Sequence, residues 1–236
     1  MDPGENGLLR VVVLSPSAEL GGAEHSLLTF LKEAGRHNVQ PTVLMPREGP
    51  LARELSRIGV SWRAVPQPRA LLSQSRSALS HSVSMMVPLL CQAPRYLARL
   101  AGAVRRARPH VIYTNGVKCH VLGALLRPVL RISTVWHARV HWHGALPGRM
   151  ADVGADLIIA NSRSTARALR RTMRSRGKLV VIHNAVDLRT FHPRGPLADV
   201  GPVPPGAPKV ALPGAFASLK GHQLLLRAAT KVWAQL

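Results

Sequence analysis

The stretch Leu8–Ser15 reads LLRVVVLS and decides the fold class. Apart from Arg10 the residues up to Leu14 form a continuous apolar run, and such a run with several β-branched residues is typical of a strand that is buried on both faces. After the pair Gly21-Gly22, apolar residues recur at helical spacing and predict an amphipathic helix that ends near Gly35. Its apolar stripe consists of Ala23, Leu27, Phe30, Leu31 and Ala34. A buried strand followed by a helix is the repeating unit of α/β proteins.

The same alternation continues along the chain. Further strands are predicted at Val39–Met45, Val60–Val65, His110–Thr114, Arg131–Trp136, Ala155–Ala160 and Lys178–Ile182. Further helices are predicted at Leu51–Ile58, Pro94–Arg108, Val117–Leu126 and Ser162–Arg174. Strands joined by helical crossovers form a parallel sheet covered on both faces. The fold class is therefore α/β, with a doubly wound, Rossmann-like parallel sheet.

Residues 193–208 (PRGPLADVGPVPPGAP) are too rich in Pro and Gly for regular structure and predict a linker. A strand at Lys209–Leu212, a turn at Gly214–Gly221 and a helix from about Leu224 are expected after it. Such a βα unit cannot cover its own apolar surfaces. We therefore expect a first domain at 1–192, a linker at 193–208 and the first unit of a truncated second domain at 209–236.

The composition excludes several classes of protein. With 236 residues, 46% of them hydrophobic, the chain has enough apolar side chains for a folded core. Only two cysteines, Cys91 and Cys119, are present, which is too few for a disulfide scaffold. The sequence contains no apolar run long enough to span a membrane and no secretory signal. These features indicate a cytoplasmic protein with reduced thiols.

The formal net charge of +21 is the most unusual property of the sequence. Between Glu54 and Asp152 there is no carboxylate, while the same interval contains fourteen arginines and lysines. Such an excess attracts nucleic acid, an anionic membrane surface or phosphorylated small molecules, although a GC-rich genome also enriches arginine. Aromatic residues make up only 4%, and no nucleic-acid-binding motif is visible, so no nucleic acid partner is expected.

The segment Pro94–Arg108 has two interpretations. It is either a helix that faces the core with solvated arginines, or an interfacial helix on anionic lipid, which the apolar run Met85–Leu90 would extend.

Two loops are candidates for substrate contact because ligands of open parallel sheets bind beyond the carboxyl ends of the strands. At Gly21 and Gly22 the backbone could approach a phosphate, but the pattern is not a dinucleotide fingerprint and could be a simple turn. In Trp136–His143 (WHARVHWH), His137 could hydrogen-bond to a substrate or exchange protons with it, and Arg139 could neutralise a phosphate. A metal site at His137, His141 and His143 is not favoured, because the nearest acid in sequence is Asp152.

Two later segments carry weaker signals. In the stretch that leaves the first domain, Asn184 and Asp187 suit side-chain-to-backbone turns. In the second domain Lys220 lies near a helix start, where it could compensate a pyrophosphate or be solvated.

Taken in order, these motifs resemble the family 4 glycosyltransferases of the GT-B fold. The matching residues are the Gly21-Gly-Ala-Glu24 loop, Val135-Trp-His137-x-Arg139, Ile159-Ala-Asn-Ser162, His183-Asn-Ala-Val-Asp187-x-x-x-Phe191-x-Pro193, and Lys220-Gly221. The resemblance implies the first half of a two-domain architecture, in which the first domain holds the acceptor and the second holds a nucleotide sugar. It also implies transfer with retention of anomeric configuration, without an obligatory metal and without a cofactor beyond the nucleotide-sugar donor.

Within the resemblance, Gly21 and Gly22 correspond to residues against the donor diphosphate. His137 corresponds to the active-site histidine near the sugar, and Lys220 to the lysine that neutralises the departing diphosphate. Three departures stand out. Ala215 occupies the position where the family usually has Arg, Ala185 replaces the glycine of the N-G-V-D motif, and the sequence stops at Leu236, before the family's paired-glutamate segment.

The expected function is therefore a retaining glycosyltransferase acting on a lipid-linked, glycan or small-molecule acceptor, peripheral to the inner face of the membrane. As this fragment the chain is expected to be inactive. The alternatives are a basic binding module for nucleic acid, or a lipid-surface adaptor without catalysis.

Overall fold

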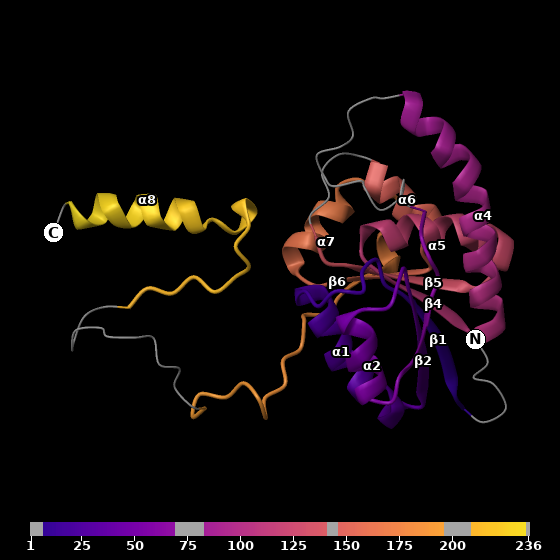
Figure 1. Cartoon of the computed structure of the whole chain (residues 1–236), viewed down its shortest axis with the longest axis horizontal. Coiled ribbons are helices and arrows are strands. Elements are labelled where there is room, and N and C mark those ends of the chain that lie inside the picture. The colour runs from indigo at the N-terminus through magenta and orange to yellow at the C-terminus, as the bar shows by residue number, and fades with distance from the viewer. Residues whose placement is uncertain (1–6, 69–82, 141–145, 196–208, 235–236) are drawn as a thin grey trace. The chain divides into compact units, whose positions relative to one another are not determined.

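Seven parallel strands form the sheet at the centre of the first part of the chain (Figure 1). The computed structural model describes residues 7–68, 83–140, 146–195 and 209–234. The strand order is β3-β2-β1-β4-β5-β6-β7, and every neighbouring pair is parallel. The strands are β1 (Leu9–Leu14), β2 (Val39–Met45), β3 (Ser61–Ala64), β4 (Val111–Asn115), β5 (Ser133–Ala138), β6 (Leu157–Ala160) and β7 (Leu179–Val181). The reversal of strand order between β1 and β4 confirms the doubly wound, Rossmann-like fold.

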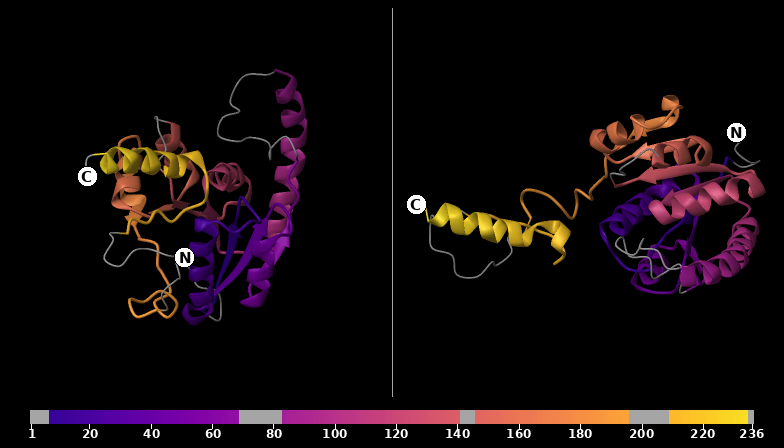
Figure 2. Two further views of the ribbon diagram at one scale, coloured as in Figure 1. Left: turned by 60° about the vertical axis from the view of Figure 1, so that its left-hand side comes forward. Right: turned by 90° about the horizontal axis from the view of Figure 1, so that it is seen from above.

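Helices cover both faces of this sheet (Figure 2). The α-helices of this part are α1 (Gly22–Ala34), α2 (Pro50–Arg57), α4 (Val83–Ala107), α5 (Val117–Leu130), α6 (Leu146–Gly154) and α7 (Arg163–Arg170). Short 3-10 helices lie at Gly35–His37 (η1) and Arg176–Lys178 (η2). The core on one face contains residues of α1 and α2, and the two clusters on the other face contain residues of α4 and α5, and of α6 and α7.

The central strand β1 is buried on both faces, as its apolar run predicts. Val11 and Val13 pack in the core beneath α1 and α2, whereas Val12 and Leu14 pack beneath α4 and α5. Val12 and Val13 are 1% and 0% exposed. Apolar side chains on both faces fix β1 between two layers of helices.

Helix α1 begins at Gly22, directly after the Gly21 cap. The Glu24 carboxylate accepts a hydrogen bond from the Gly21 backbone N–H (3.2 Å), which ties the first turn of the helix to the loop before it. The predicted stripe is only partly correct, because Leu28 is buried while Phe30 is 43% exposed. Phe30 instead stacks on Tyr113 of β4, with ring centroids 5.8 Å apart.

Helix α4 begins at Val83 and not at Pro94, so that the predicted start is wrong by three turns. Pro94 lies inside the helix and is not its first residue. Leu100, Ala101 and Val104 are buried against the sheet, which confirms the interpretation of this segment as a core-facing helix. The apolar stripe of residues 94–108 is therefore not available for insertion into a membrane, whereas the side chains of Met85–Leu90 lie outside the described part of the helix. Arginines of this segment remain exposed. They are Arg95, Arg99, Arg105, Arg106 and Arg108.

Helix α6 was not predicted, because its sequence LPGRMADVG resembles a turn. Its glycines instead permit close packing. A Cβ atom on Gly154 would lie 2.6 Å from the Trp136 ring and 2.7 Å from Ala124, and one on Gly148 would lie 2.1 Å from the Thr172 hydroxyl. Tertiary contact thus decides a helix for which the local sequence gives no signal.

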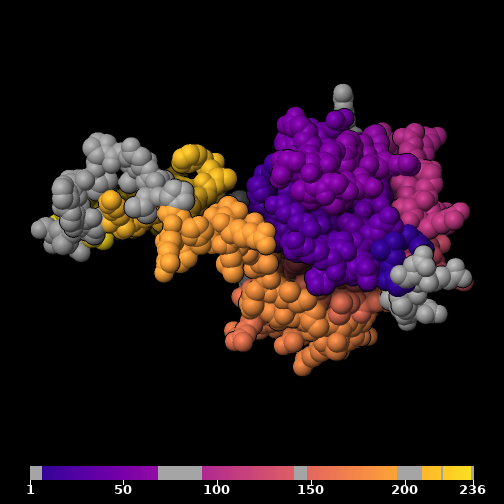
Figure 3. All heavy atoms as spheres, turned by 90° about the horizontal axis from the view of Figure 1, so that it is seen from below, coloured from indigo at the N-terminus to yellow at the C-terminus, as the bar shows by residue number. Residues whose placement is uncertain are grey.

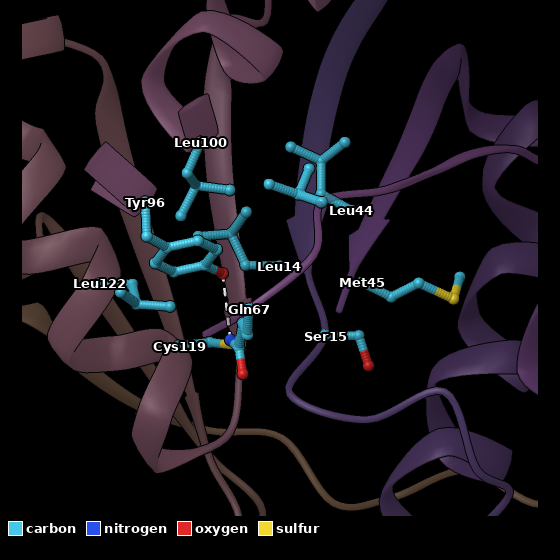
Figure 4. Close-up of a pocket in the computed structure, with 10 residues that line it drawn as sticks. Leu14, Ser15, Leu44, Met45, Gln67, Tyr96, Leu100, Cys119 and Leu122 are labelled. Carbon is cyan, nitrogen blue, oxygen red and sulfur yellow. Dashed lines mark hydrogen bonds between the residues drawn. The ribbon is translucent and has the colours of Figure 1, made fainter. Parts of the chain in front are cut away.

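A small cavity lies where β1 and β2 end beneath α4 and α5 (Figure 4). Its volume of about 10 Å³ is that of a single water. In its wall the Gln67 side chain donates a hydrogen bond to the Tyr96 hydroxyl (3.0 Å), and burial raises the pKa of the Cys119 thiol. The cavity is too small for a substrate.

The chain divides into two units, Met1–Phe191 and His192–Leu236. The second contains η3 (Ser218–Lys220) and α8 (His222–Trp233), and its described residues form no strand. The strand predicted at Lys209–Leu212 is therefore not formed, and Val210 is 80% exposed. A strand needs a partner for its backbone hydrogen bonds, and the described residues of this unit provide none.

Figure 3 shows the first unit from another side, where residues from the start of the chain (indigo to violet) lie beside residues from the end of this unit (orange). Among the described residues, no helix is both long and apolar enough to cross a membrane.

Candidate active site

Polar side chains gather at the carboxyl edge of the sheet, on the face that carries α1. The strand register places Asn115, the last residue of β4, beside His137 of β5. Tyr113 lies two residues before Asn115 and so points to the same face. His137 and Arg139 are thus brought together with groups from β4, as the position of the predicted loop at a strand end implies.

Arg139 is the centre of this cluster. Its Nε donates to Asn115 Oδ1 (2.9 Å), its Nη1 donates to Ser26 Oγ (2.8 Å) and Asn184 Oδ1 (2.9 Å), and its Nη2 donates to His137 Nδ1 (3.2 Å). Burial lowers the pKa of the guanidinium from its usual value. Because most of its N–H donors are used within the protein, Arg139 orients its neighbours and contributes positive charge.

These contacts fix the tautomer of His137. A guanidinium can only donate, so His137 Nδ1 must be the acceptor and carries no proton. Tyr113 Oη also contacts Nδ1, and burial raises the pKa of the Tyr113 hydroxyl to about 12, so that it is protonated and donates as well. Burial, followed by the charge of Arg139, lowers the pKa of His137 to about 4. At neutral pH His137 is therefore uncharged, with its proton on Nε2.

Two buried donors in the cluster lack partners among the described residues. They are His137 Nε2 and Asn115 Nδ2. His137 is 9% exposed and Asn115 is 0% exposed. Because buried donors without acceptors are costly, they favour a ligand or a water that presents oxygen atoms at this point. Each of the two N–H groups can donate to a hydroxyl or phosphate oxygen.

A second row of polar groups supports Arg139 from β6 and from the segment after β7. Asn161 Nδ2 donates to the Arg139 carbonyl (3.3 Å), and Thr165 Oγ1 of α7 donates to Asn161 Oδ1 (2.9 Å). Asn184 was predicted to form a turn with its own backbone, but its Oδ1 accepts from Arg139 and from Ser26 (3.3 Å) instead. The prediction for Asp187 is confirmed, because its carboxylate accepts from the Arg189 backbone N–H (3.0 Å).

Gly21 and Gly22 lie at the start of α1, and neither has a positive φ. A Cβ atom on Gly22 would meet nothing within 4 Å, whereas one on Gly21 would lie 3.0 Å from Glu24 Oε2. The surface above Gly22 is thus open. The first turn of a helix leaves backbone N–H groups without intrahelical partners, so this point can accept an anion.

Lys220 belongs to the second unit, where it ends η3 and is exposed. Gly221 follows with φ +79° and caps α8. The helix begins at His222, two residues before the predicted start.

Among the described residues no group of three His, Cys, Asp or Glu side chains could hold a metal ion. His141 and His143, weighed as ligands together with His137, lie outside the described residues. The contacts of His137 are a hydroxyl and a guanidinium, and Arg139 lowers its pKa, which does not suit a cation.

Sequence reasoning missed Ser26, Tyr113 and Asn115. Ser26 and Arg139 are 113 residues apart in the chain, so no local pattern joins them. The available signal was at β4, where an apolar strand ends in polar residues that share a face with His137.

Comparison with known proteins bears on the family and the fold. The sequence profile described as Glycosyltransferase Family 4 matches residues 20–190. No curated protein matches the sequence.

Several solved structures share the fold. A glycosyltransferase from Rickettsia africae ESF-5 has a TM-score of 0.68 at 15% identity, over 95% of this chain and 57% of that chain. Anabaena Alr3699/HepE, crystallised with UDP and glucose, has a TM-score of 0.58 at 20% identity, over 78% of this chain and 46% of that chain. The lipopolysaccharide outer core galactosyltransferase WaaB, in its apo form, has a TM-score of 0.54 at 11% identity, over 78% and 47%.

This chain thus spans about half the length of the solved structures that it matches. The family profile covers the chain from just before α1 to the segment after β7. This range includes every residue of the polar cluster around Arg139. The chain belongs to Glycosyltransferase Family 4.

Proposed function

We propose that this chain is the acceptor-side half of a retaining glycosyltransferase that uses a nucleotide-sugar donor. The observation that carries the proposal is the pair of buried donors, His137 Nε2 and Asn115 Nδ2, at the carboxyl edge of the sheet. The similarity in fold to Anabaena Alr3699/HepE, which was crystallised with UDP-glucose, supports a nucleotide sugar as co-substrate. The acceptor is a glycan, a lipid-linked sugar or a small molecule.

His137 acts in this proposal as a hydrogen-bond donor. Its Nδ1 is occupied by Tyr113 and Arg139, so the ring has no free lone pair with which to take a proton. Nε2–H can donate to an oxygen of the transferred sugar or of the acceptor, and Arg139 stabilises negative charge nearby. Of the two roles that the sequence suggests for His137, hydrogen bonding and proton exchange, the proposal retains hydrogen bonding.

The transfer itself needs no carboxylate nucleophile. The bond between the anomeric carbon and the diphosphate oxygen breaks, and the acceptor hydroxyl oxygen bonds to the same face of the sugar. The hydroxyl proton moves to the departing phosphate oxygen, and the nucleoside diphosphate leaves. Negative charge develops on that leaving group. The groups proposed to bind it are the open backbone at Gly22, the adjoining Gly21 and the cation Lys220.

Activity is tested with a longer protein that contains this chain and has the full length of its relatives. It is incubated with a panel of labelled nucleotide sugars, and both transfer and donor hydrolysis are measured. His137→Ala is expected to lower turnover by roughly 100-fold, since it removes a donor to the reacting groups. Arg36→Gln, at an exposed position of η1, is the control and should leave turnover unchanged.

Near-normal turnover of His137→Ala would remove this residue from the mechanism. Absence of both transfer and hydrolysis with every donor would contradict the proposed enzyme.

We also propose a cytoplasmic location with peripheral attachment to the inner membrane face through the exposed arginines of α4. Basic residues near an anionic surface contribute about 1 kcal/mol each. Flotation with anionic liposomes should be lost in Arg99→Gln/Arg105→Gln/Arg106→Gln, and unchanged flotation would contradict this attachment.

A further inference from the structure

A groove lined by arginines lies between α7 and the edge strand β7. Its lining consists of Arg163, Ala166, Arg167, Arg170, Arg171, Arg176 and Val181. The volume of about 480 Å³ is within the range of small-molecule sites, roughly 300–1,000 Å³. Ala166 and Val181 give it an apolar floor, and the five arginines surround that floor. We call this feature the arginine groove.

Helical geometry gathers four of these arginines on one side of α7. At 3.6 residues per turn, Arg163, Arg167, Arg170 and Arg171 fall within about 100° of the helix circumference and extend along about 12 Å of its axis. The opposite side carries Thr165 and Leu169, which are buried. Arg176 of η2 adds a fifth guanidinium from a different segment.

The positive charge of the arginine groove is not compensated within the described part of the chain. None of its five guanidinium groups forms an ion pair or a side-chain hydrogen bond there, whereas Arg36, Arg47, Arg57 and Arg127 each pair with a carboxylate. The sequence contains no acid between Asp156 and Asp187.

Asp152 does not neutralise the arginine groove either, because its carboxylate is bound to backbone N–H groups. It accepts from the backbone N–H groups of Arg174 (2.8 Å) and Ser175 (2.9 Å). Like charges three or four residues apart destabilise a helix by about 0.2–0.5 kcal/mol per pair. The row on α7 therefore weakens the helix in the absence of an anionic ligand.

The ligand chemistry follows from charge and shape. A phosphate monoester carries about −1.5 to −2 at neutral pH, so five guanidinium groups match about three phosphates. The planar fork of arginine pairs with two phosphate oxygens at once. The lining contains no aromatic residue on which a nucleic acid base could stack.

We propose that the arginine groove binds a ligand with clustered phosphate groups, either a phosphorylated soluble molecule or a phosphorylated lipid headgroup. This site is separate from the cluster around Arg139 and does not depend on sugar transfer. Its tests therefore stand even where the proposed enzyme activity fails.

Calorimetric titration of the intact chain with inorganic tripolyphosphate, at low salt, tests the site. Saturable binding is expected. The exposed pair Arg167→Gln/Arg170→Gln should raise Kd at least about 10-fold, because each variant loses charge-assisted hydrogen bonds to phosphate oxygens. Glutamine keeps the helix propensity of α7, so that folding is preserved.

The matched control removes two charges from the other face of the sheet. Lys32→Gln/Arg53→Gln, on exposed positions of α1 and α2 where neither side chain forms an ion pair in the described part of the chain, should change Kd less than 2-fold. Equal losses in both pairs would show a diffuse field and overturn the site, as would binding that does not saturate. A single-stranded DNA that binds more tightly than tripolyphosphate, and that both pairs weaken equally, would also overturn it.

Vesicles of phosphatidic acid in phosphatidylcholine separate the two sources of phosphate. Sedimentation that the groove pair reduces and the control pair does not would assign the lipid headgroup. Sedimentation that is unchanged in the groove pair, together with lost tripolyphosphate binding, would assign a soluble ligand. Both results retain the arginine groove as a site for clustered phosphates.

Discussion

Arginine serves two different purposes in this molecule. Arg139 donates hydrogen bonds to four protein acceptors and is partly buried, so that its position is fixed. The five arginines of the arginine groove are exposed and donate to no acceptor in the described part of the chain. The number of arginines alone therefore says little about function. A guanidinium surrounded by fixed acceptors orients a site, whereas several without acceptors are available to a ligand.

The largest difference between the two is expected in stability. Arg139→Ala removes the donor to Asn115 Oδ1 and to Ser26 Oγ, and one of the two donors to Asn184 Oδ1 and to His137 Nδ1. It should lower the free energy of unfolding by about 3 kcal/mol. Arg167→Ala on the exposed side of α7 should change it by less than about 0.5 kcal/mol. Urea denaturation of the two variants measures both values, and equal effects would contradict the distinction.

A smaller effect is expected from pH. The pKa of His137 is lowered to about 4 and that of His120 to about 3, in both cases mainly by burial, while an unfolded histidine has a pKa near 6.5. Below pH 6.5 the unfolded state therefore binds protons that the folded state does not. The free energy of unfolding should fall by up to about 1.4 kcal/mol per pH unit for each histidine between pH 6.5 and 4.

The control for this prediction is His137→Gln, which removes one of the two groups. Its pH dependence should be shallower by about one proton, measured by urea denaturation at several pH values. A variant with the same slope as the unchanged chain would show that His137 is not protected from protonation. The arginine groove should contribute nothing, because arginine does not titrate in this range.

The smallest effect on stability is expected from a charge reversal within the arginine groove. Arg167→Glu places an acid between Arg163 and Arg171 at i±4 spacing, and should raise the free energy of unfolding by a few tenths of a kcal/mol. The same change should abolish tripolyphosphate binding. Thermal unfolding and titration of one sample measure the two effects, and a variant that is destabilised would contradict the inferred repulsion along α7.

The sequence alone predicted the layers of this fold well. Apolar runs such as Leu8–Ser15 identify strands buried on both faces, and six further strands were found near their observed positions. Helix α6 and the start of α4 were missed, because tertiary packing overrides the local signals of Gly148, Gly154 and Pro94. At Lys209–Leu212 the local composition suits a strand, but no strand forms because the described residues of this unit provide no partner strand.

The site was predictable only in part. His137 and Arg139 follow from their place after a strand, because the carboxyl ends of parallel strands share one edge. Their partners Ser26, Tyr113 and Asn115 come from other elements, and no spacing in the sequence specifies such contacts. The tautomer of His137 depends on these partners, and it therefore needed the structure.

Arg139 and Tyr113 keep the His137 ring neutral, with Nδ1 as acceptor and Nε2–H as donor. Long-range proton–nitrogen correlation spectra of the uniformly ¹⁵N-labelled chain test this arrangement directly, with His137→Gln used to assign the ring. We predict a proton on Nε2 and a bare Nδ1, unchanged from pH 7.5 down to pH 5. A proton on Nδ1, or titration of this ring near pH 6.5, would contradict the account.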